Sequence, residues 1–236
     1  MRSNIYTISF TSIMTIILGF ILSTVAGKLE VIQNEQVEND MKKNILVSLG
    51  YVQSSENPWT SKDVQNLFEK NIESYVLDPY GNRKDVDPQS IDSEIDIENL
   101  PVYLKKENGQ IDGYAIPISG KGLWSTLYGF FAIEPDGRTV KGITFYKHKE
   151  TPGLGGEVDK EWFQNNFIGK KFVDQNDNLV GIKVLKGKVD RNSSTAYYKV
   201  DGISGATITS KGLEKFLLDD LKKYDPFFQK IRLGKG

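Results

Sequence analysis

The chain contains no cysteine and a single histidine, His148. Without cysteine, thiol nucleophiles, iron–sulfur ligation and disulfides are excluded for this chain. One imidazole leaves too few nitrogen ligands for a typical zinc site, so we expect no metal centre. The lack of cysteine is compatible with either side of a membrane and leaves the compartment open.

An excess of one charge is also missing. The sequence has 30 basic and 31 acidic residues, a net charge of −1, and no long basic stretch. Nucleic acid is therefore not an expected partner. The 236 residues leave room for one domain of about 150 to 200 residues plus an appendage.

No charged residue interrupts the stretch Ser3–Gly27, which is rich in Ile, Leu, Phe and Thr. At about 1.5 Å per residue, such a helix is longer than the roughly 30 Å hydrocarbon core and spans it with some tilt. The alternative is a cleaved signal peptide, with Thr24–Ala26 as a passable cleavage site. We expect a retained anchor, because the stretch is too long for a usual signal core and only Arg2 precedes it.

The orientation of this anchor is weakly determined by charge, because two or three residues precede it and long domains translocate largely regardless of charge. The simplest arrangement is a single-pass anchor with its N-terminus inside and the rest of the chain outside the cytoplasm. We divide the chain into an anchor (1–29), a helical juxtamembrane and connecting region (30–98) and a main domain (99–236).

The connecting region shows two helical patterns. Apolar residues recur from Val31 to Leu49 before Gly50, and a capping box at Thr60–Asp63 opens a second helix with apolar positions from Val64 to Val76. Asp78–Asn82 stops this helix. Residues 82–98 are acidic and short of large apolar groups, which indicates a surface segment.

The main domain shows consecutive hairpin signals. Asn108-Gly109 supplies the positive φ angles of a tight turn, and Pro135–Gly137 marks a second hairpin. The expected strands are Val102–Lys106, Gly113–Ile118, Leu127–Ile133, Thr139–Tyr146, Gly181–Leu185 and Ala196–Val200, with a short helix at Asp159–Phe167. This order predicts an α+β fold, an antiparallel sheet with flanking helices, preceded by one transmembrane helix and a helical stalk.

Residues 201–212 combine hydroxyl side chains, an acidic residue and three glycines just ahead of an amphipathic helix. The apolar face of that helix is marked by Leu213, Leu217, Leu221 and Tyr224. Backbone N–H groups at a helix N-terminus are unpaired and favour negative charge, so a phosphate group is favoured beside Thr207 and Thr209, with Lys211 as a compensating charge. A plain turn with a helix cap is the alternative reading.

Asp201, Ser204, Gly205, Ala206 and Thr207 stand in the register D-x-x-[ST]-G-A-T, for which the chance match is on the order of one in a million per position. This register resembles the flavinylation motif of the FMN-binding domain family. The resemblance implies that Thr207 carries FMN through a phosphodiester bond and that the other four residues are the recognition context. It also implies a separate Mg²⁺-dependent flavin transferase that uses FAD and releases AMP. The alternative attachment residue is Thr209, whose hydroxyl is two residues further on.

A second glycine-rich loop, His148–Gly156, follows an expected strand, a common place for a ligand loop. Its glycines allow the backbone to approach a flat ring, and Leu154 offers an apolar platform. A plain turn with a solvated histidine is the alternative. The run H-x-E-T-P-G-L-G resembles the second signature of the same family, whose loop lies against the isoalloxazine. The resemblance makes Glu150, Thr151, Gly153 and Leu154 candidate cofactor-binding residues.

The turn ending in Trp124 is similar to the G-x-G-x-W segment of the family, which makes Trp124 a further cofactor-binding candidate. A core position suits a tryptophan equally well, since tryptophan is usually well buried.

With its anchor, nearly the whole chain resembles the flavin-carrying membrane subunits of two complexes, the Na⁺-translocating NADH:quinone oxidoreductases and the Rnf complexes. Physical reasoning does not separate the two, and the resemblance favours the first. It implies a subunit of an oxidoreductase in the cell inner membrane, with a periplasmic FMN-binding domain and other membrane subunits of the redox-driven Na⁺ pump as partners. The covalent FMN relays electrons from NADH towards quinone, with no catalytic residue beyond the flavin. Because the span holds no ionisable residue, the ion path is expected elsewhere.

Two other classes of function remain open from the residues alone. A non-redox, membrane-anchored binding or scaffold module predicts a colourless protein even in the presence of the transferase. A stand-alone flavoprotein reductase predicts activity without partner subunits, and it needs acid–base residues in a substrate pocket that the sequence does not reveal.

Overall fold

A computed structural model describes residues 4–234 apart from 55, 89–90 and 92–95, and only the main chain of residue 31. Part of the acidic segment 82–98 therefore lies outside the described residues. The chain divides into two compact units, Met1–Met41 and Lys42–Gly236. The expected division of the chain at residues 29 and 98 stays a prediction. The compact unit that contains the main domain begins at Lys42.

The described residues of the first unit form one helix, α1 (Asn4–Ser48), which continues into the second unit. Anchor and stalk, expected as separate helices, form this single element. It is long and apolar enough to cross a membrane, and its most apolar window is entirely unburied. Soon after the helix ends, Gly50 adopts a positive φ of 89°, a conformation that glycine tolerates without steric cost.

The second unit contains a six-stranded antiparallel sheet in the order β2-β1-β3-β4-β5-β6. Its strands are β1 (Ile72–Leu77), β2 (Arg83–Lys84), β3 (Leu100–Glu107), β4 (Gln110–Lys121), β5 (Thr126–Ile133) and β6 (Val140–Lys147). Both expected hairpins are confirmed. Asn108 and Gly109 have φ of 51° and 80° between β3 and β4, the backbone that an Asn-Gly turn requires.

The first strand, β1, corrects the expected helical reading of residues 64–76. Helix α2 (Ser61–Asn71) does begin at the capping box, where the Asp63 N–H donates to Thr60 Oγ1 over 3.3 Å and the Thr60 N–H donates to Asp63 Oδ2 over 2.8 Å. It ends earlier than expected, because Ile72–Leu77 pairs with β3 along its whole length. The spacing of apolar residues in so short a run fits a helix and a strand alike. Here pairing with a distant strand selects the strand.

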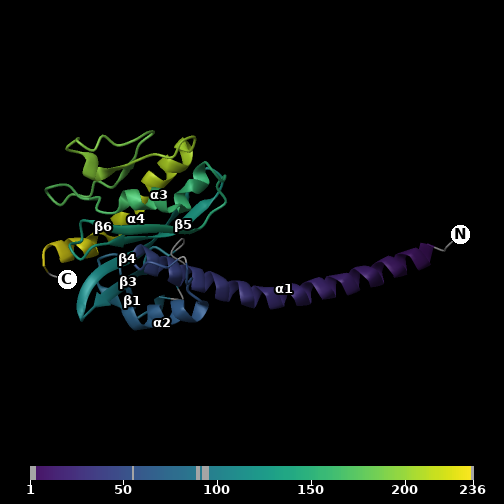
Figure 1. Cartoon of the computed structure of the whole chain (residues 1–236). Helices are drawn as coiled ribbons and strands as arrows, with labels where there is room; N and C mark the ends of the chain where they lie inside the picture. Colours follow the sequence, from purple (N-terminus) through teal and green to yellow (C-terminus); the bar gives the residue numbers. More distant parts are fainter. Residues whose placement is uncertain (1–3, 55, 89–90, 92–95, 235–236) are drawn as a thin grey trace. The chain divides into compact units, whose positions relative to one another are not determined.

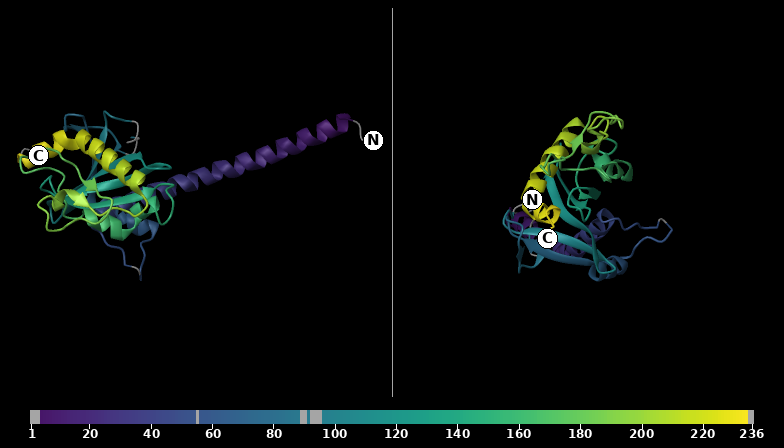
Figure 2. Two further views of the ribbon diagram at one scale, coloured as in Figure 1. Left: turned by 90° about the horizontal axis from the view of Figure 1, so that it is seen from above. Right: turned by 90° about the vertical axis from the view of Figure 1, so that its left-hand side faces the viewer.

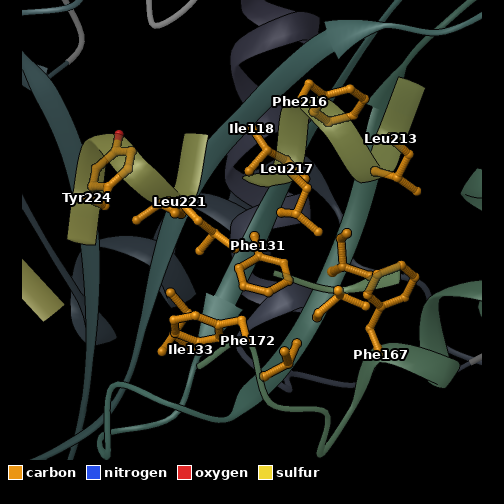
Figure 3. Close-up of a cluster of buried hydrophobic side chains, with 14 of the residues drawn as sticks. Ile118, Phe131, Ile133, Phe167, Phe172, Leu213, Phe216, Leu217, Leu221 and Tyr224 are labelled. Carbon is orange, nitrogen blue, oxygen red and sulfur yellow. The ribbon is translucent and has the colours of Figure 1, made fainter. Parts of the chain in front are cut away.

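One face of the sheet is covered by α4 (Thr207–Arg232), which packs against β4 (Figures 1 and 2). Its expected apolar side chains are buried, and Figure 3 shows several of them gathered against side chains of the strands, namely Leu213, Leu217, Leu221 and Tyr224. Tyr224 also donates a 3.0 Å hydrogen bond from its hydroxyl to the Pro101 carbonyl. The long C-terminal helix is thereby fixed to the sheet at a buried polar contact.

The opposite face is covered by α2 and by the last turns of α1 (Figure 1). The Thr144 hydroxyl of β6 donates to the Asn44 carbonyl over 3.1 Å. Gly142, two residues earlier, leaves room for the Ser48 carbonyl, because a Cβ there would lie 2.3 Å from that oxygen. Backbone contact of this kind positions the end of α1 on the sheet.

Between β6 and α4 the chain forms short elements only. They are η2 (Gly155–Asp159), α3 (Glu161–Gln164), η3 (Asn165–Phe167), β7 (Lys183–Val184), η4 (Ala196–Tyr198) and β8 (Lys199–Val200). The expected strand at Ala196–Val200 begins instead as a 3-10 turn, and only its last two residues pair with β7. That pairing is parallel, so this small second sheet is an addition to the expected antiparallel fold.

Candidate functional site

The side chain of Glu150 joins three segments that the sequence motifs singled out. Its Oε1 accepts hydrogen bonds from the backbone N–H groups of Trp124 (2.8 Å) and Ser125 (3.1 Å). Its Oε2 accepts from the Leu123 N–H (3.2 Å) and from the Thr209 hydroxyl (2.6 Å). The turn after β4, the loop after β6 and the first turn of α4 therefore meet at one carboxylate.

This carboxylate is buried, with 5% of the residue exposed. Burial by itself would raise the pKa of Glu150, but the hydrogen bonds from Thr209 and from the three backbone N–H groups outweigh it and hold the pKa below its ordinary value. No Lys, Arg or His side chain forms an ion pair with it among the residues that the structure describes. Glu150 is thus an ionised carboxylate solvated by neutral donors.

Glycines make this convergence possible. A Cβ at Gly122 would lie 2.6 Å from Glu150 Oε1, and a Cβ at Gly155 would lie 2.6 Å from both Glu150 Oε2 and Thr209 Oγ1. Gly205 has a φ of +72°, and a Cβ there would lie 2.7 Å from Leu154 Cδ2. Close approach therefore explains one glycine in each of the three motifs, namely Gly122, Gly155 and Gly205.

The two candidate hydroxyls at the start of α4 differ in exposure. Thr207 is the first residue of the helix and is exposed, whereas Thr209 is 1% exposed and donates to Glu150. Residues two apart on a helix lie on nearly opposite faces, so one hydroxyl is turned outward when the other is turned inward. Ala206 occupies the cap position, and its methyl side chain cannot cap the helix, so the first N–H groups of α4 are left to other partners.

Exposed apolar side chains accompany these segments. Trp124 is 70% exposed and Leu154 is 43% exposed. The alternative reading of Trp124 as a core residue is therefore wrong, because its backbone is tied to Glu150 while its ring is left in solvent. Leu123 (46%) and Ile208 (60%) are also exposed beside these motifs. No sequence pattern selects these two residues, since isolated apolar residues beside a motif carry no periodicity.

The remaining candidates take less central positions. Asp201 accepts a 2.7 Å hydrogen bond from the Val189 N–H, which fastens the loop before η4 to the motif. Ser204 and Lys211 are exposed, and Lys211 lies one helical turn from Thr207, on the same side of α4. Thr151 is exposed. Gly153 lies in the turn between Thr151 and Leu154 and has a φ of 75°.

The histidine of the second motif is not a solvated surface residue, which was the simpler reading. His148 Nδ1 accepts the Glu150 N–H over 3.2 Å, and its Nε2 lies 3.4 Å from Asp159 Oδ2. Its side chain is 13% exposed. The ring therefore orders the loop that carries Glu150. Within the described part of the chain, no group of three or more His, Cys, Asp or Glu side chains is arranged to hold a metal ion.

Comparison with known proteins gives a consistent family. Residues 122–222 match the FMN-binding domain family. The NqrC subunit of the Na(+)-translocating NADH-quinone reductase of Pseudomonas aeruginosa is 35% identical over 241 residues, covering 90% of this chain and 91% of that protein. The corresponding NqrC protein of Pasteurella multocida is 34% identical over 248 residues, covering 94% and 92%.

Solved structures agree with this result. The crystal structure of NqrC from Parabacteroides distasonis has a TM-score of 0.73 and 30% identity, and the match covers 85% of this chain and 96% of that one. NqrC from Shewanella oneidensis has a TM-score of 0.67 at 24% identity, with 81% and 96% covered, and supports the fold alone. The expected α+β fold is confirmed. As the resemblance favoured, the chain belongs to the NqrC family of the Na⁺-translocating NADH-quinone reductases, and it is an oxidoreductase subunit with an FMN-binding domain.

Proposed function

We propose that this chain carries FMN covalently on Thr207 and relays electrons between other subunits of a Na⁺-translocating NADH:quinone oxidoreductase. The observation that supports the attachment site is the contrast between two hydroxyls. Thr207 is exposed at the first residue of a 26-residue helix, and Thr209 is buried against Glu150. A transferase reaches an outward hydroxyl, whereas the inward one is shielded.

The residues around Thr207 fit a phosphate ester. Ala206 at the N-terminus of α4 provides no side-chain cap, so the first N–H groups of the helix and its dipole are available to a phosphate on the Thr207 oxygen. Lys211 adds a positive charge one turn along the helix. In maturation, the Thr207 oxygen forms the new bond to phosphorus, the anhydride bond of FAD breaks, AMP leaves and the hydroxyl proton passes to the transferase.

The exposed apolar side chains fit the ring system of the cofactor. Trp124 and Leu154 offer apolar surface beside the motif loop, and the turn of Thr151 and Gly153 leaves the backbone accessible. When bound, FMN supplies the electron transfer, and the chain binds and orients it. Covalent attachment removes dissociation, which suits a domain outside the cytoplasm. We propose that α1 anchors the chain in the inner membrane with this domain in the periplasm.

The attachment is tested on the full chain coexpressed with a flavin transferase. The tryptic peptide Val200–Lys211 contains both threonines, and its mass and fragmentation identify the modified residue. We expect the flavin mass and in-gel fluorescence to be lost in Thr207→Ala and kept in the matched control Thr209→Ser, which retains the hydroxyl bonded to Glu150. Flavin that survives denaturation in Thr207→Ala would contradict the assignment of Thr207. Peptide fragments that carry the flavin mass on Thr209 would assign the attachment to Thr209 instead.

A further inference from the structure

We propose that Glu150 is a positioning residue of the flavin site and that its buried negative charge lowers the reduction potential of the flavin. The inference rests on the proposed attachment at Thr207. It assigns to Glu150 a role different from direct contact with the ring, because the side chain is turned into the protein and its oxygens are occupied by donors of the chain.

The positioning role follows from the completeness of the hydrogen bonds. A carboxylate offers about four lone-pair sites, and the Glu150 oxygens accept from three backbone N–H groups and the Thr209 hydroxyl. Gly122 and Gly155 approach these oxygens so closely that no Cβ fits. A glutamine at this position would place its NH₂ group, itself a donor, against N–H or O–H donors, and those hydrogen bonds would be lost. An aspartate is one methylene shorter and does not span the same three segments.

The helix start is the element most dependent on this arrangement. Thr209 is two residues beyond the attachment residue, and its hydroxyl is the point at which the first turn of α4 is held to the loop of Glu150. Leu154 of the same loop packs against Gly205, so the loop and the attachment motif are in direct contact. A flavin on Thr207 is therefore held by a helix turn whose orientation Glu150 determines.

The electrostatic role follows from the absence of a countercharge. All donors to Glu150 are neutral, and no cation forms an ion pair with it in the described part of the chain. A full negative charge thus persists in a buried place, hydrogen-bonded to Thr209, which is two residues from the attachment point. Complete reduction of FMN takes up two electrons from the reductant and two protons from solvent, or one proton when the product stays anionic. A fixed anion nearby opposes the added negative charge.

The test uses the full-length, flavin-loaded chain in detergent and measures the midpoint potential by a dithionite titration followed in the visible spectrum. Glu150→Gln removes the charge and retains the size. We expect its potential to rise, with an increase of about tenfold in the equilibrium constant for reduction, the scale of one unit charge at an effective protein dielectric. The matched control is Glu157→Gln in η2, directly after this loop, whose partly exposed carboxylate accepts from the Trp162 ring nitrogen. This control is expected to keep the wild-type potential.

Positioning is measured separately from charge. Thr209→Val keeps the carboxylate and removes the hydroxyl that holds the helix start. We expect lower fluorescence anisotropy of the attached flavin in Thr209→Val and recovery in Thr209→Ser. A wild-type potential in Glu150→Gln overturns the electrostatic role, and wild-type anisotropy in Thr209→Val overturns the positioning role. Thr209→Val decides the second point even where Glu150→Gln fails to fold.

The attachment and this inference fail in different ways. A wild-type Val200–Lys211 peptide without the flavin mass contradicts the attachment itself and with it the inference. A loaded wild-type chain whose Glu150→Gln variant has an unchanged potential contradicts the electrostatic inference and leaves the attachment intact.

Discussion

The hydroxyl of Thr209 donates a 2.6 Å hydrogen bond to Oε2 of Glu150, 59 residues earlier in the chain. This contact joins the two longest motifs of the sequence, and it turns Thr209 into the protein. Thr207, on the other side of the same helical turn, is exposed as a consequence. In the proposed attachment, helix orientation therefore decides between the two nearby threonines.

Gly212→Ala is expected to destabilise the domain. Alanine in place of glycine normally stabilises an exposed helix by about 1 kcal/mol. Here the new Cβ would lie 2.1 Å from the Lys121 carbonyl oxygen of β4, so α4 must move away from the sheet at a cost of about 2 kcal/mol. Urea unfolding measures the change. Gly187→Ala, with no atom within 4 Å of the added Cβ, is the control, and equal stability of the two variants would contradict the prediction.

Gly205→Ala is expected to lower flavin loading. Both Gly205 (φ +72°) and Gly169 (φ +75°) have a left-handed backbone, but only at Gly205 does the added Cβ meet a side chain, Leu154, at 2.7 Å. Each variant incurs about 1 kcal/mol of backbone strain. Only Gly205→Ala also displaces the loop from the attachment motif. The covalently bound flavin per protein is the measurement, and equal loading of both variants would show that the Leu154 contact is unimportant.

The stability of the domain is expected to depend on pH through Glu150. Because the folded pKa of Glu150 lies below its ordinary value, its ionisation stabilises the folded state above the unfolded pKa of about 4.5, and this contribution is lost as pH falls through the folded pKa. The difference in free energy of unfolding between wild type and Glu150→Gln should be largest near neutral pH. It should shrink as the pH falls below the unfolded pKa and through the folded pKa of Glu150. Urea unfolding from pH 7 to pH 3 measures it. A constant difference would contradict the ionised state.

Asp220 provides a control of opposite sign. Burial raises its pKa, against the opposing effects of Lys223 and of the Ser119 N–H, which donates to its carboxylate over 2.9 Å. Its ionisation therefore costs stability as pH rises from the unfolded value towards the folded one. Relative to Asp220→Asn, wild type should lose stability as pH rises through that range. An identical pH dependence of the two proteins would count against this assignment.

Tyr224→Phe is expected to cost about 1 kcal/mol or more, because it removes a buried hydrogen bond from the hydroxyl to the Pro101 carbonyl. The hydroxyl–carbonyl distance is 3.0 Å, and Tyr224 is 3% exposed. Thermal unfolding measures the loss. Tyr197→Phe, at a 60% exposed side chain, should be neutral, and a similar loss there would show that the assay does not report on the buried hydrogen bond.

The absence of cysteine makes the orientation directly measurable. A single cysteine introduced as Ser194→Cys, at an exposed position, is the only thiol in the chain. With the domain in the periplasm, a membrane-impermeant maleimide is expected to label it in intact cells. Labelling that requires cell lysis would place the domain in the cytoplasm. An exposed cysteine of a cytoplasmic protein in the same cells controls for leakage.

Short-range patterns predicted much of the fold. The Asn108-Gly109 turn, the Thr60–Asp63 capping box and the apolar face of α4 each depend on residues a few positions apart, and all three are present. The strand at Ile72–Leu77 was missed because an apolar run of that length fits helix and strand alike, and pairing with β3 selects the strand. The exposure of Trp124 was open for a similar reason, since burial depends on what packs above a residue.

Motif spacings alone indicate which segments belong to the candidate site, because hydroxyl, acidic and glycine residues at set intervals mark those segments before any fold is known. How the segments act depends on their arrangement in three dimensions. Thr209 and Glu150 bond across 59 residues, and no local spacing encodes that contact. The physical reason is that α4 and two loops are placed together by the sheet that they cover, and this placement turns one hydroxyl inward and leaves the other at the surface.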